Sequence, residues 1–369
     1  MEKPVIRISV RNRVEFILRS GDLTSRSGPA ADKEAMLKGS RFHRKIQKQM
    51  GSTYQAEVPL KKESEYEDLI LCVEGRADGI FTENEAVCID EIKGIYKSLD
   101  SLEEPVPVHR AQALCYGWIY LEAHDLERID IQMTSGQLDT EEIRRFRETI
   151  TRGELEKWYQ DLTGEYHKWV SYQLAWRKER NASMETLEFP FPYRKGQREM
   201  VAGVYHAISE EEQIFIQAPT GIGKTMSAIF PAVRAVGQGK GETVFYLTAR
   251  TITRTVAEDA FSILRGKGLH FKSITITAKE KMCFCDEMDC DPQKCPYAKG
   301  HYDRINDAVY ELWTKEEAFD RETILAQAEK YSVCPFEMTL DLAVWMDGIV
   351  CDYNYVFDPN VYLKRFFGE

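Results

Sequence analysis

A glycine-rich stretch that follows a short apolar run has the residue types of a phosphate-binding loop. Residues 214–216 form the apolar run that a buried parallel strand needs, and a tight turn into a helix beginning near Lys224 follows. Successive N–H groups in such a turn face one anion, and the helix directs its positive end to the same point. The eight residues of this predicted loop are Ala218, Pro219, Thr220, Gly221, Ile222, Gly223, Lys224 and Thr225. We therefore expect an ATP site.

Individual residues of this loop have distinct expected roles. Gly221 and Gly223 allow the backbone to turn tightly. Lys224 is the catalytic cation that would reach the outer phosphates, and Thr225 would place its hydroxyl on the Mg²⁺ ion that bridges them. The loop therefore predicts both a nucleotide and a magnesium cofactor.

Two acidic residues and a lysine predict a second site in the first half of the chain. Residues 68–81 and 86–93 read as strands joined by a turn at 82–85. In adjacent strands Asp78 and Glu91 can lie side by side as oxygen ligands for Mg²⁺ or Mn²⁺, with Lys93 on the face of Glu91 because strand side chains alternate. Such a group supports metal-dependent phosphodiester hydrolysis. An exposed hairpin with solvated or paired charges has the same pattern.

Five cysteines of the second half form a third candidate site. They are Cys283, Cys285, Cys290, Cys295 and Cys334. Their spacing is not the repeated Cys-x-x-Cys pair of a zinc ribbon. Thiolates select soft metals, so four of them would hold either a [4Fe–4S] cluster or zinc, and residue types alone do not distinguish the two.

The amino-acid composition indicates the class of protein that carries these sites. The chain has 369 residues, 43% of them apolar and 30% charged, which predicts two or three globular domains. No apolar run approaches the roughly 18 residues of a membrane span, and the N-terminus does not read as a signal peptide. We expect a cytoplasmic protein with reduced thiols and no membrane partner.

The net charge of −11 is unusual for a nucleic-acid-binding protein, but it is unevenly distributed. Residues 1–50 contain 12 Lys and Arg against 5 Asp and Glu, so this segment carries +7 and the remainder −18. A local basic face would suit DNA, although a solvated charged face is the alternative.

The expected elements place these residues on strands and helices. Strands are predicted at 5–10, 54–60, 68–81, 86–93, 128–133, 214–216, 243–248 and 349–352. Helices are predicted around 14–18, over 32–50, over 139–180, before the phosphate loop and after it. A further helix carries His109, Gln112 and Tyr116, and residues 181–188 read as a linker.

The first half resembles the RecB-type branch of PD-(D/E)XK nucleases. In that branch a Gly-x-x-x-His helix precedes the sheet and a Gln-x-x-x-Tyr helix follows the lysine. Gly39 with His43 and Gln112 with Tyr116 match these two motifs. The resemblance implies that His43 joins Asp78 and Glu91 as a Mg²⁺ or Mn²⁺ ligand, and that Gln112 and Lys93 act with them in catalysis. Glu57 is a further, weaker candidate.

The second half resembles the XPD/DinG iron–sulfur helicases of superfamily 2. Ala218 replaces the first glycine of the general loop pattern as in that superfamily, and Cys295 and Cys334 are each followed by Pro and an aromatic residue. The resemblance implies that Cys283, Cys290, Cys295 and Cys334 hold a [4Fe–4S] cluster, with Cys285 as a possible substitute for Cys283. Residues 297–333 would form the helical arch.

The same resemblance assigns residues to adenine and DNA. The stretch 189–197 is similar to the helicase Q motif, in which Gln197 would read the adenine edge and Tyr193 would stack against the base. Arg250 stands where helicase motif Ia contacts the DNA backbone, with a structural ion pair as the equal alternative.

We accordingly predict an α/β protein of two domains. A PD-(D/E)XK nuclease-like domain (1–180) with a long C-terminal helical region precedes a partial RecA-like P-loop domain (189–369) with iron–sulfur (281–296 and 334) and arch insertions. Asp352 is a poor candidate for the ATPase acid, and no DEAH box is found, so an N-terminal portion of a longer helicase is expected.

The resulting functional prediction is a monomeric 5′ to 3′ DNA helicase and nuclease of DNA repair or recombination, with single-stranded and forked DNA as partners. The alternative is a DNA- and ATP-binding fragment that has nuclease activity only and does not unwind DNA. DNA-stimulated ATP turnover distinguishes the two.

Overall fold

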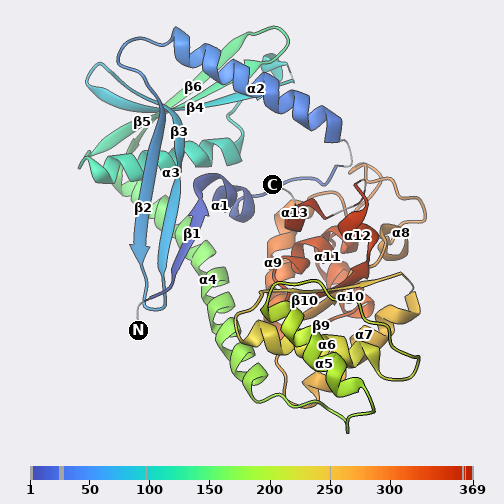
Figure 1. Ribbon diagram of the computed structural model, residues 1–369. Coiled ribbons are helices and arrows are strands. Elements are labelled where there is room, and N and C mark those ends of the chain that lie inside the picture. Colours follow the sequence, from blue (N-terminus) through green and yellow to red (C-terminus); the bar gives the residue numbers. More distant parts are fainter. Residues whose placement is uncertain are drawn as a thin grey trace. The chain divides into compact units, whose positions relative to one another are not determined.

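The chain of the computed structural model folds into two units (Figure 1). Unit 1 consists of Met1–Arg19 and Ser25–Ser171, and unit 2 of Ser20–Thr24 and Tyr172–Glu369. The structure describes residues 3–24, 29–96, 98–249, 251–359, 361 and 363–367, with the backbone alone for 29–36, 251–252 and 364–365. In this described part, no helix has the length and apolar character needed to cross a membrane.

Unit 1 is built on a mixed six-stranded sheet in the order β1-β3-β4-β5-β6, with β2 paired to β3. Its elements are β1 (Val5–Ser9), α1 (Val10–Ile17), α2 (Pro29–Gln49), β2 (Gln55–Glu65), β3 (Ile70–Glu83), β4 (Ala86–Ile95), the 3₁₀ turn η1 (Leu99–Ser101), α3 (Pro107–Ala123), β5 (Arg128–Gln137), β6 (Ile143–Thr151) and the start of α4 (Arg152–Glu185). The predicted hairpin from residue 68 to 93 is confirmed, because β3 pairs antiparallel with β4.

Strand β3 changes partner along one of its edges. Residues 70–74 pair in parallel with β1, and residues 79–83 pair with β4, whereas β2 follows the other edge along the strand. Residues 75–78 therefore lack a ladder partner on the edge shared by β1 and β4. Beside this gap the carboxylate Oδ2 of Asp78 accepts the backbone N–H of Ile92 in β4 at 2.7 Å. Strands β3 and β4 thus separate at Asp78, the residue before their first paired position.

Helices α2 and α3 cover opposite faces of this sheet. Phe42 and Ile46 of α2 pack with Ile92, whereas Gln112 of α3 contacts Lys93. Neighbouring residues of a strand point to opposite faces, so the two helices must lie on different sides of β4. The prediction that Glu91 and Lys93 share a face is confirmed, since Lys93 Nζ lies 2.8 Å from Glu91 Oε1.

Unit 2 contains a parallel sheet in the order β7-β10-β8-β9 with helices around it. Its elements are the end of α4, α5 (Gln197–Ser209), α6 (Lys224–Gly237), β7 (Val244–Thr248), α7 (Thr251–Arg265), β8 (Ser273–Thr275), α8 (Lys279–Met282), α9 (His301–Lys315), β9 (Ala318–Phe319), α10 (Arg321–Tyr331), α11 (Pro335–Ala343), β10 (Gly348–Asp352), α12 (Asn354–Phe357) and α13 (Lys364–Phe367). One core cluster joins α6 and α7 to Met184 of α4 and to Val350 of β10. The predicted strand before Asp352 and the helical character of residues 297–333 are confirmed.

Three expected elements differ from the structure. Residues 143–151 form strand β6 rather than the start of the helix predicted over 139–180, because β5 offers a free edge on which Phe146 pairs with Met133. The linker expected at 181–188 is helical up to Glu185, since Met184 is buried in the core of unit 2. Residues 214–216 form no strand, and Phe215 is 94% exposed. Apolar character alone does not make a strand; hydrogen bonds to a neighbouring strand do, and no described strand pairs with this segment.

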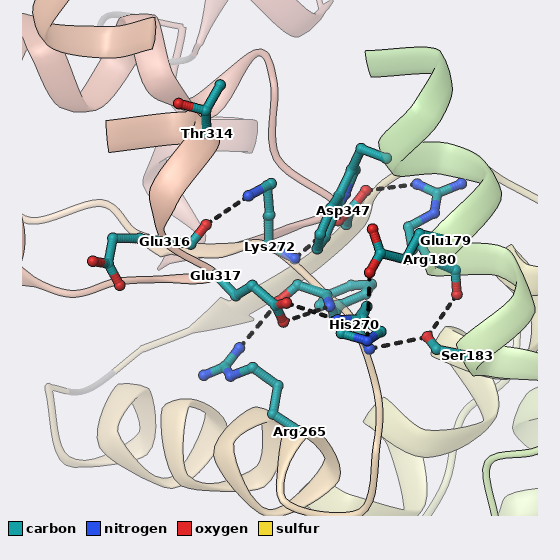
Figure 2. A network of polar contacts seen from close by, with 12 residues as sticks. Glu179, Arg180, Ser183, Arg265, His270, Lys272, Thr314, Glu316, Glu317 and Asp347 are labelled. Atoms are coloured by element: carbon teal, nitrogen blue, oxygen red, sulfur yellow. Dashed lines mark hydrogen bonds and ion pairs between the residues drawn. The ribbon is translucent and has the colours of Figure 1, made fainter. Parts of the chain in front are cut away.

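A buried polar network fastens the end of α4 to the sheet of unit 2 (Figure 2). Asp347 accepts hydrogen bonds from Trp176 Nε1 at 2.8 Å and from Arg180 at 2.6 Å. The backbone N–H of Lys272 donates to the same carboxylate at 2.9 Å. The Lys272 ammonium donates to the carbonyls of Trp313 and Glu316, both at 2.6 Å, and lies 4.1 Å from the Trp176 ring centroid.

Burial of Lys272 predicts a pH-dependent stability. Desolvation lowers the pKa of Lys272 to about 8, against 10.5 in an exposed lysine. Between these two values the unfolded chain binds more protons than the folded one, so the free energy of unfolding should rise with pH, by at most about 3 kcal/mol. Urea unfolding between pH 7.5 and 10.5 measures this slope. The slope should be smaller in Lys272→Met and unchanged in the exposed control Lys240→Met; an equal slope in all three proteins would contradict the prediction.

Candidate functional site

The phosphate loop has the backbone conformation of an anion cradle. Gly221 and Gly223 have φ values of 82° and 83°, which residues with a Cβ rarely adopt, and helix α6 begins at Lys224 as predicted. Lys224 Nζ donates to the loop's own carbonyls, Ala218 O at 3.1 Å and Pro219 O at 3.0 Å. The Thr225 hydroxyl accepts from Tyr246 Oη at 3.3 Å. The loop is therefore curled around its lysine.

The predicted adenine-binding stretch packs against this loop. A Cβ on Gly223 would lie only 2.7 Å from Gln197 Nε2, so the buried Gln197 amide touches the turn directly. Arg194 donates to the carbonyl of Gly221, a contact that the sequence did not indicate. Tyr193 stacks on Phe189 with ring centroids 4.4 Å apart and is 43% exposed, so one face of an aromatic pair borders the site.

Of the other two predicted helicase residues, the structure describes Asp352, which ends strand β10. Arg250 falls outside the described residues, so its DNA contact stays a prediction. Asp352 pairs in parallel register with Thr248 and forms an ion pair with the largely buried Arg254. Because its carboxylate is engaged with Arg254, Asp352 remains a poor candidate for the ATPase acid.

The predicted nuclease residues gather where β3 and β4 separate. His43 Nδ1 lies 3.4 Å from Asp78 Oδ1. Glu57, the weaker candidate, lies in β2 with a φ of 56° and accepts from Gln47 at 3.0 Å. Gln47 also donates to the carbonyl of Asp78 at 2.9 Å. Helix α2 thus brings His43 close to Asp78, and its Gln47 bonds to both Glu57 and Asp78.

The α3 side of this cluster is buried and contains an unused donor. Glu91 is 3% exposed, and burial together with the charge of Asp78 raises its pKa to about 7 against the opposing charge of Lys93. Gln112 Oε1 accepts from Lys93 Nζ at 3.0 Å. The Gln112 Nε2 group is buried and finds no hydrogen-bond partner among the described residues. An unpaired buried amide donor is costly, so it points to a ligand with acceptor oxygens.

A cavity of about 690 Å³ lies on the same face of the sheet. Met133 pairs in register with Glu91 and Phe146 pairs with Met133, and both line the cavity together with Arg110 and Trp158. Side chains in register on neighbouring strands share a face, so the cavity lies on the face of the sheet that carries Glu91. The candidate nuclease residues themselves do not line it.

All five cysteines of the third site line one small cavity. Its volume is about 20 Å³, and Cys283, Cys285, Cys290, Cys295 and Cys334 all border it. Cys285 Sγ lies 3.9 Å from Cys295 Sγ. The donor set is soft and enclosed, as a thiolate-bound metal centre requires. Residues that are 51 positions apart in the chain are thereby brought together.

The thiols of this cavity are not yet in a ligating arrangement. Across the described residues, no group of three or more His, Cys, Asp or Glu side chains is placed to hold a metal ion. The cavity, about 20 Å³, has a volume near that of one water molecule, so it does not accommodate a cluster in this arrangement of the thiols. Burial raises the pKa of Cys285 and of Cys334 to about 11, so metal binding here releases protons. Burial by itself lowers the pKa of Lys279, but the hydrogen bond and charge of the neighbouring Cys290 raise it, and the net shift is upward.

Sequence comparisons support the helicase interpretation of the second half. Residues 194–315 match the DEAD/DEAH box helicase family, and residues 270–365 match the DEAD_2 family. The regulator of telomere elongation helicase 1 homolog of Caenorhabditis briggsae is 21% identical over an alignment of 221 residues, and the match covers 48% of this chain and 22% of that relative. This chain therefore spans about a fifth of the length of that relative.

Two solved structures resemble the chain at low similarity. A crystal structure of SSO0001 is 17% identical with a TM-score of 0.28, over 44% of this chain and 77% of that one. A truncated XPD is 17% identical with a TM-score of 0.33, over 46% of this chain and 47% of that one. The two family matches are the stronger findings: residues 194–315 are similar to DEAD/DEAH box helicases and residues 270–365 to the DEAD_2 family, which supports an ATP-dependent helicase.

Proposed function

We propose that this protein is an ATP-dependent 5′ to 3′ DNA helicase of the XPD/DinG iron–sulfur type, with a metal-dependent nuclease in unit 1, acting in DNA repair or recombination. The observation that carries the proposal is the curled phosphate loop with its two glycines of positive φ at the start of α6. The family matches over residues 194–365 support the same activity.

The loop explains how the chain would hold a nucleotide. Lys224 now donates to two loop carbonyls, and the outer phosphates of ATP would replace them as better, charged acceptors. The exposed face of Tyr193 would stack on adenine, whose edge Gln197 would read. Magnesium bound with ATP would neutralise phosphate charge, and the Thr225 hydroxyl would join its ligands.

The nuclease part of the proposal rests on the cluster at the β3–β4 separation. Asp78, Glu91 and His43 would hold Mn²⁺ or Mg²⁺, which polarises a phosphodiester. Lys93 would orient water or offset charge at the phosphate, and the unpaired Gln112 Nε2 would donate to a phosphate oxygen. The cavity on the face of the sheet that carries Glu91 supports entry of a DNA strand.

DNA-stimulated ATP hydrolysis tests the helicase proposal. The 369 residues alone should bind ATP with little turnover, because the Asp352 carboxylate is engaged with Arg254. In a version of the protein that is extended to supply an ATPase acid, we expect turnover that rises on addition of single-stranded DNA, together with unwinding of forked substrates. ATP binding without DNA-stimulated turnover, accompanied by metal-dependent cleavage, would instead support a nuclease that only binds nucleotide and DNA.

Metal content tests the cysteine site. Anaerobically purified protein should contain about four irons per chain and be brown. Cys295→Ser should lose most of this metal because a ligand of the enclosed site is removed, whereas Cys72→Ser, at a buried cysteine of unit 1, should retain it. Comparison of Cys283→Ser with Cys285→Ser identifies the first ligand. One zinc per chain without visible absorbance would exclude the cluster.

A further inference from the structure

The short segment Ser20–Thr24 lies between α1 and α2 of unit 1 in the chain, yet it belongs to unit 2. The Leu23 side chain is 7% exposed, and it forms a small apolar cluster with Cys295 and Ala298. It also lines the 20 Å³ cavity that all five cysteines border. An aliphatic side chain from a distant part of the sequence therefore forms part of the wall of the candidate metal site.

Four hydrogen bonds hold this segment against the chain that follows Cys295. They are Leu23 N to Ala298 O at 2.8 Å, Tyr302 N to Gly21 O at 3.0 Å, Gly21 N to Asp303 Oδ1 at 2.8 Å and Gly300 N to Asp22 Oδ1 at 2.7 Å. Two bonds join backbone to backbone, and in the other two each side supplies one aspartate carboxylate. Gly21 has a φ of 87°, which permits the turn that presents its N–H and C=O to the same partner segment. The bonding is reciprocal and specific, unlike a chance surface contact.

We propose that Ser20–Thr24 is an integral part of the cysteine metal site, in which Leu23 is a positioning residue that closes the thiol cavity against water. This inference rests on the proposed metal centre at Cys283, Cys290, Cys295 and Cys334. The apolar shell of a metal site controls solvent access and the local dielectric. A thiolate-bound centre behind Leu23 is therefore shielded from chelators and oxidants.

Metal binding and docking of the segment must stabilise each other. If the metal centre binds more tightly when Leu23 is in place, the bound metal favours the docked segment by the same factor. The segment continues into α2, which begins at Pro29 and carries His43, the candidate ligand of the nuclease site.

The test is the rate at which bound metal is released to a chromogenic chelator that responds to both iron and zinc. The full chain is loaded with iron(II) and sulfide under anaerobic conditions, and release is followed with time. Leu23→Ala should release metal about tenfold faster than the unaltered protein. Leu23→Met should restore slow release because it refills the wall. Leu37→Ala, at a leucine that is 55% exposed, is the matched control and should behave as the unaltered protein.

Hydrogen exchange provides a second measurement. If Leu23 only stabilised the fold, metal loading would not change the amide exchange rates of its segment. The amides of Gly21, Leu23 and Tyr302 should exchange more slowly in the metal-loaded protein than in the metal-free protein. Asp22→Ala removes the acceptor of Gly300 N and leaves the cavity wall intact, so it should speed both amide exchange and metal release. This variant provides the test if Leu23→Ala does not fold.

The outcomes separate this inference from the metal site itself. The role proposed for the segment is overturned, while the metal site stands, if Leu23→Ala and Leu37→Ala bind metal normally and release it at equal rates. It is also overturned if amide exchange in the segment is the same with and without metal. Failure of the unaltered protein to bind either iron or zinc overturns the proposed metal centre, and the inference falls with it.

Discussion

Replacing Asp78 by Asn is expected to reduce metal-dependent DNA cleavage by about 10²-fold or more, because even loss of a partner that only orients a metal ligand costs 10 to 100-fold. Asp78 accepts the Ile92 N–H with one oxygen and faces His43 with the other, so the amide keeps the strand geometry and removes the anionic ligand. Cleavage of labelled single-stranded DNA with Mn²⁺ measures the effect. Glu91→Gln should give a similar loss.

Two comparisons make this result specific. Glu74→Gln alters an exposed carboxylate on the same strand, paired with Arg7, and should cleave as the unaltered protein does. Nucleotide binding should be unchanged in Asp78→Asn, since the phosphate loop belongs to the other unit. Cleavage that persists in the double variant of Asp78 and Glu91 would assign the nuclease activity to another site or another protein.

Replacing Lys224 by Ala is expected to weaken ATP binding by about 10²-fold, which corresponds to the loss of one or two charge-assisted hydrogen bonds of 1.5–3 kcal/mol each. The ammonium group already lies within the loop, 3.0 to 3.1 Å from two carbonyls, so little reorganisation is needed to reach a phosphate. Titration with a fluorescent ATP analogue in the presence of Mg²⁺ measures the affinity.

The control for this variant is Lys240→Ala, an exposed lysine of the turn between α6 and β7, which should bind ATP normally. DNA-stimulated hydrolysis should be lost in Lys224→Ala, whereas metal-dependent cleavage of DNA without ATP should remain. Equal ATP affinity in the two lysine variants would mean that the loop from Ala218 to Thr225 is not the nucleotide site.

Local chemistry determined which elements carry the candidate sites. The alternation and turn residues around 82–85 predicted the β3–β4 hairpin, and the glycines before Lys224 predicted the start of α6, because both signals act over a few residues. The shared face of Glu91 and Lys93 followed from strand periodicity alone. The grouping of the cysteines in one cavity agrees with their assignment to one site.

Strand pairing was decided only by tertiary structure. The helical period after Leu155 predicts a helix over 139–180, whereas residues 143–151 pair with β5 as a strand. Residues 214–216 have the composition of a strand but pair with no described strand. A strand is a relation between distant segments, so its composition can be read locally and its hydrogen-bond partner cannot.

Contacts between distant segments of the chain also lay beyond the sequence. The change of β3 from β1 to β4 leaves residues 75–78 without a ladder partner on one edge, and Asp78 lies in this gap. Leu23 had no sequence feature that linked it to Cys295, which lies more than 270 positions away. The sequence by itself determined the chemistry available to this protein, whereas the fold decided which distant groups share one small volume, because that depends on the packing of the whole chain.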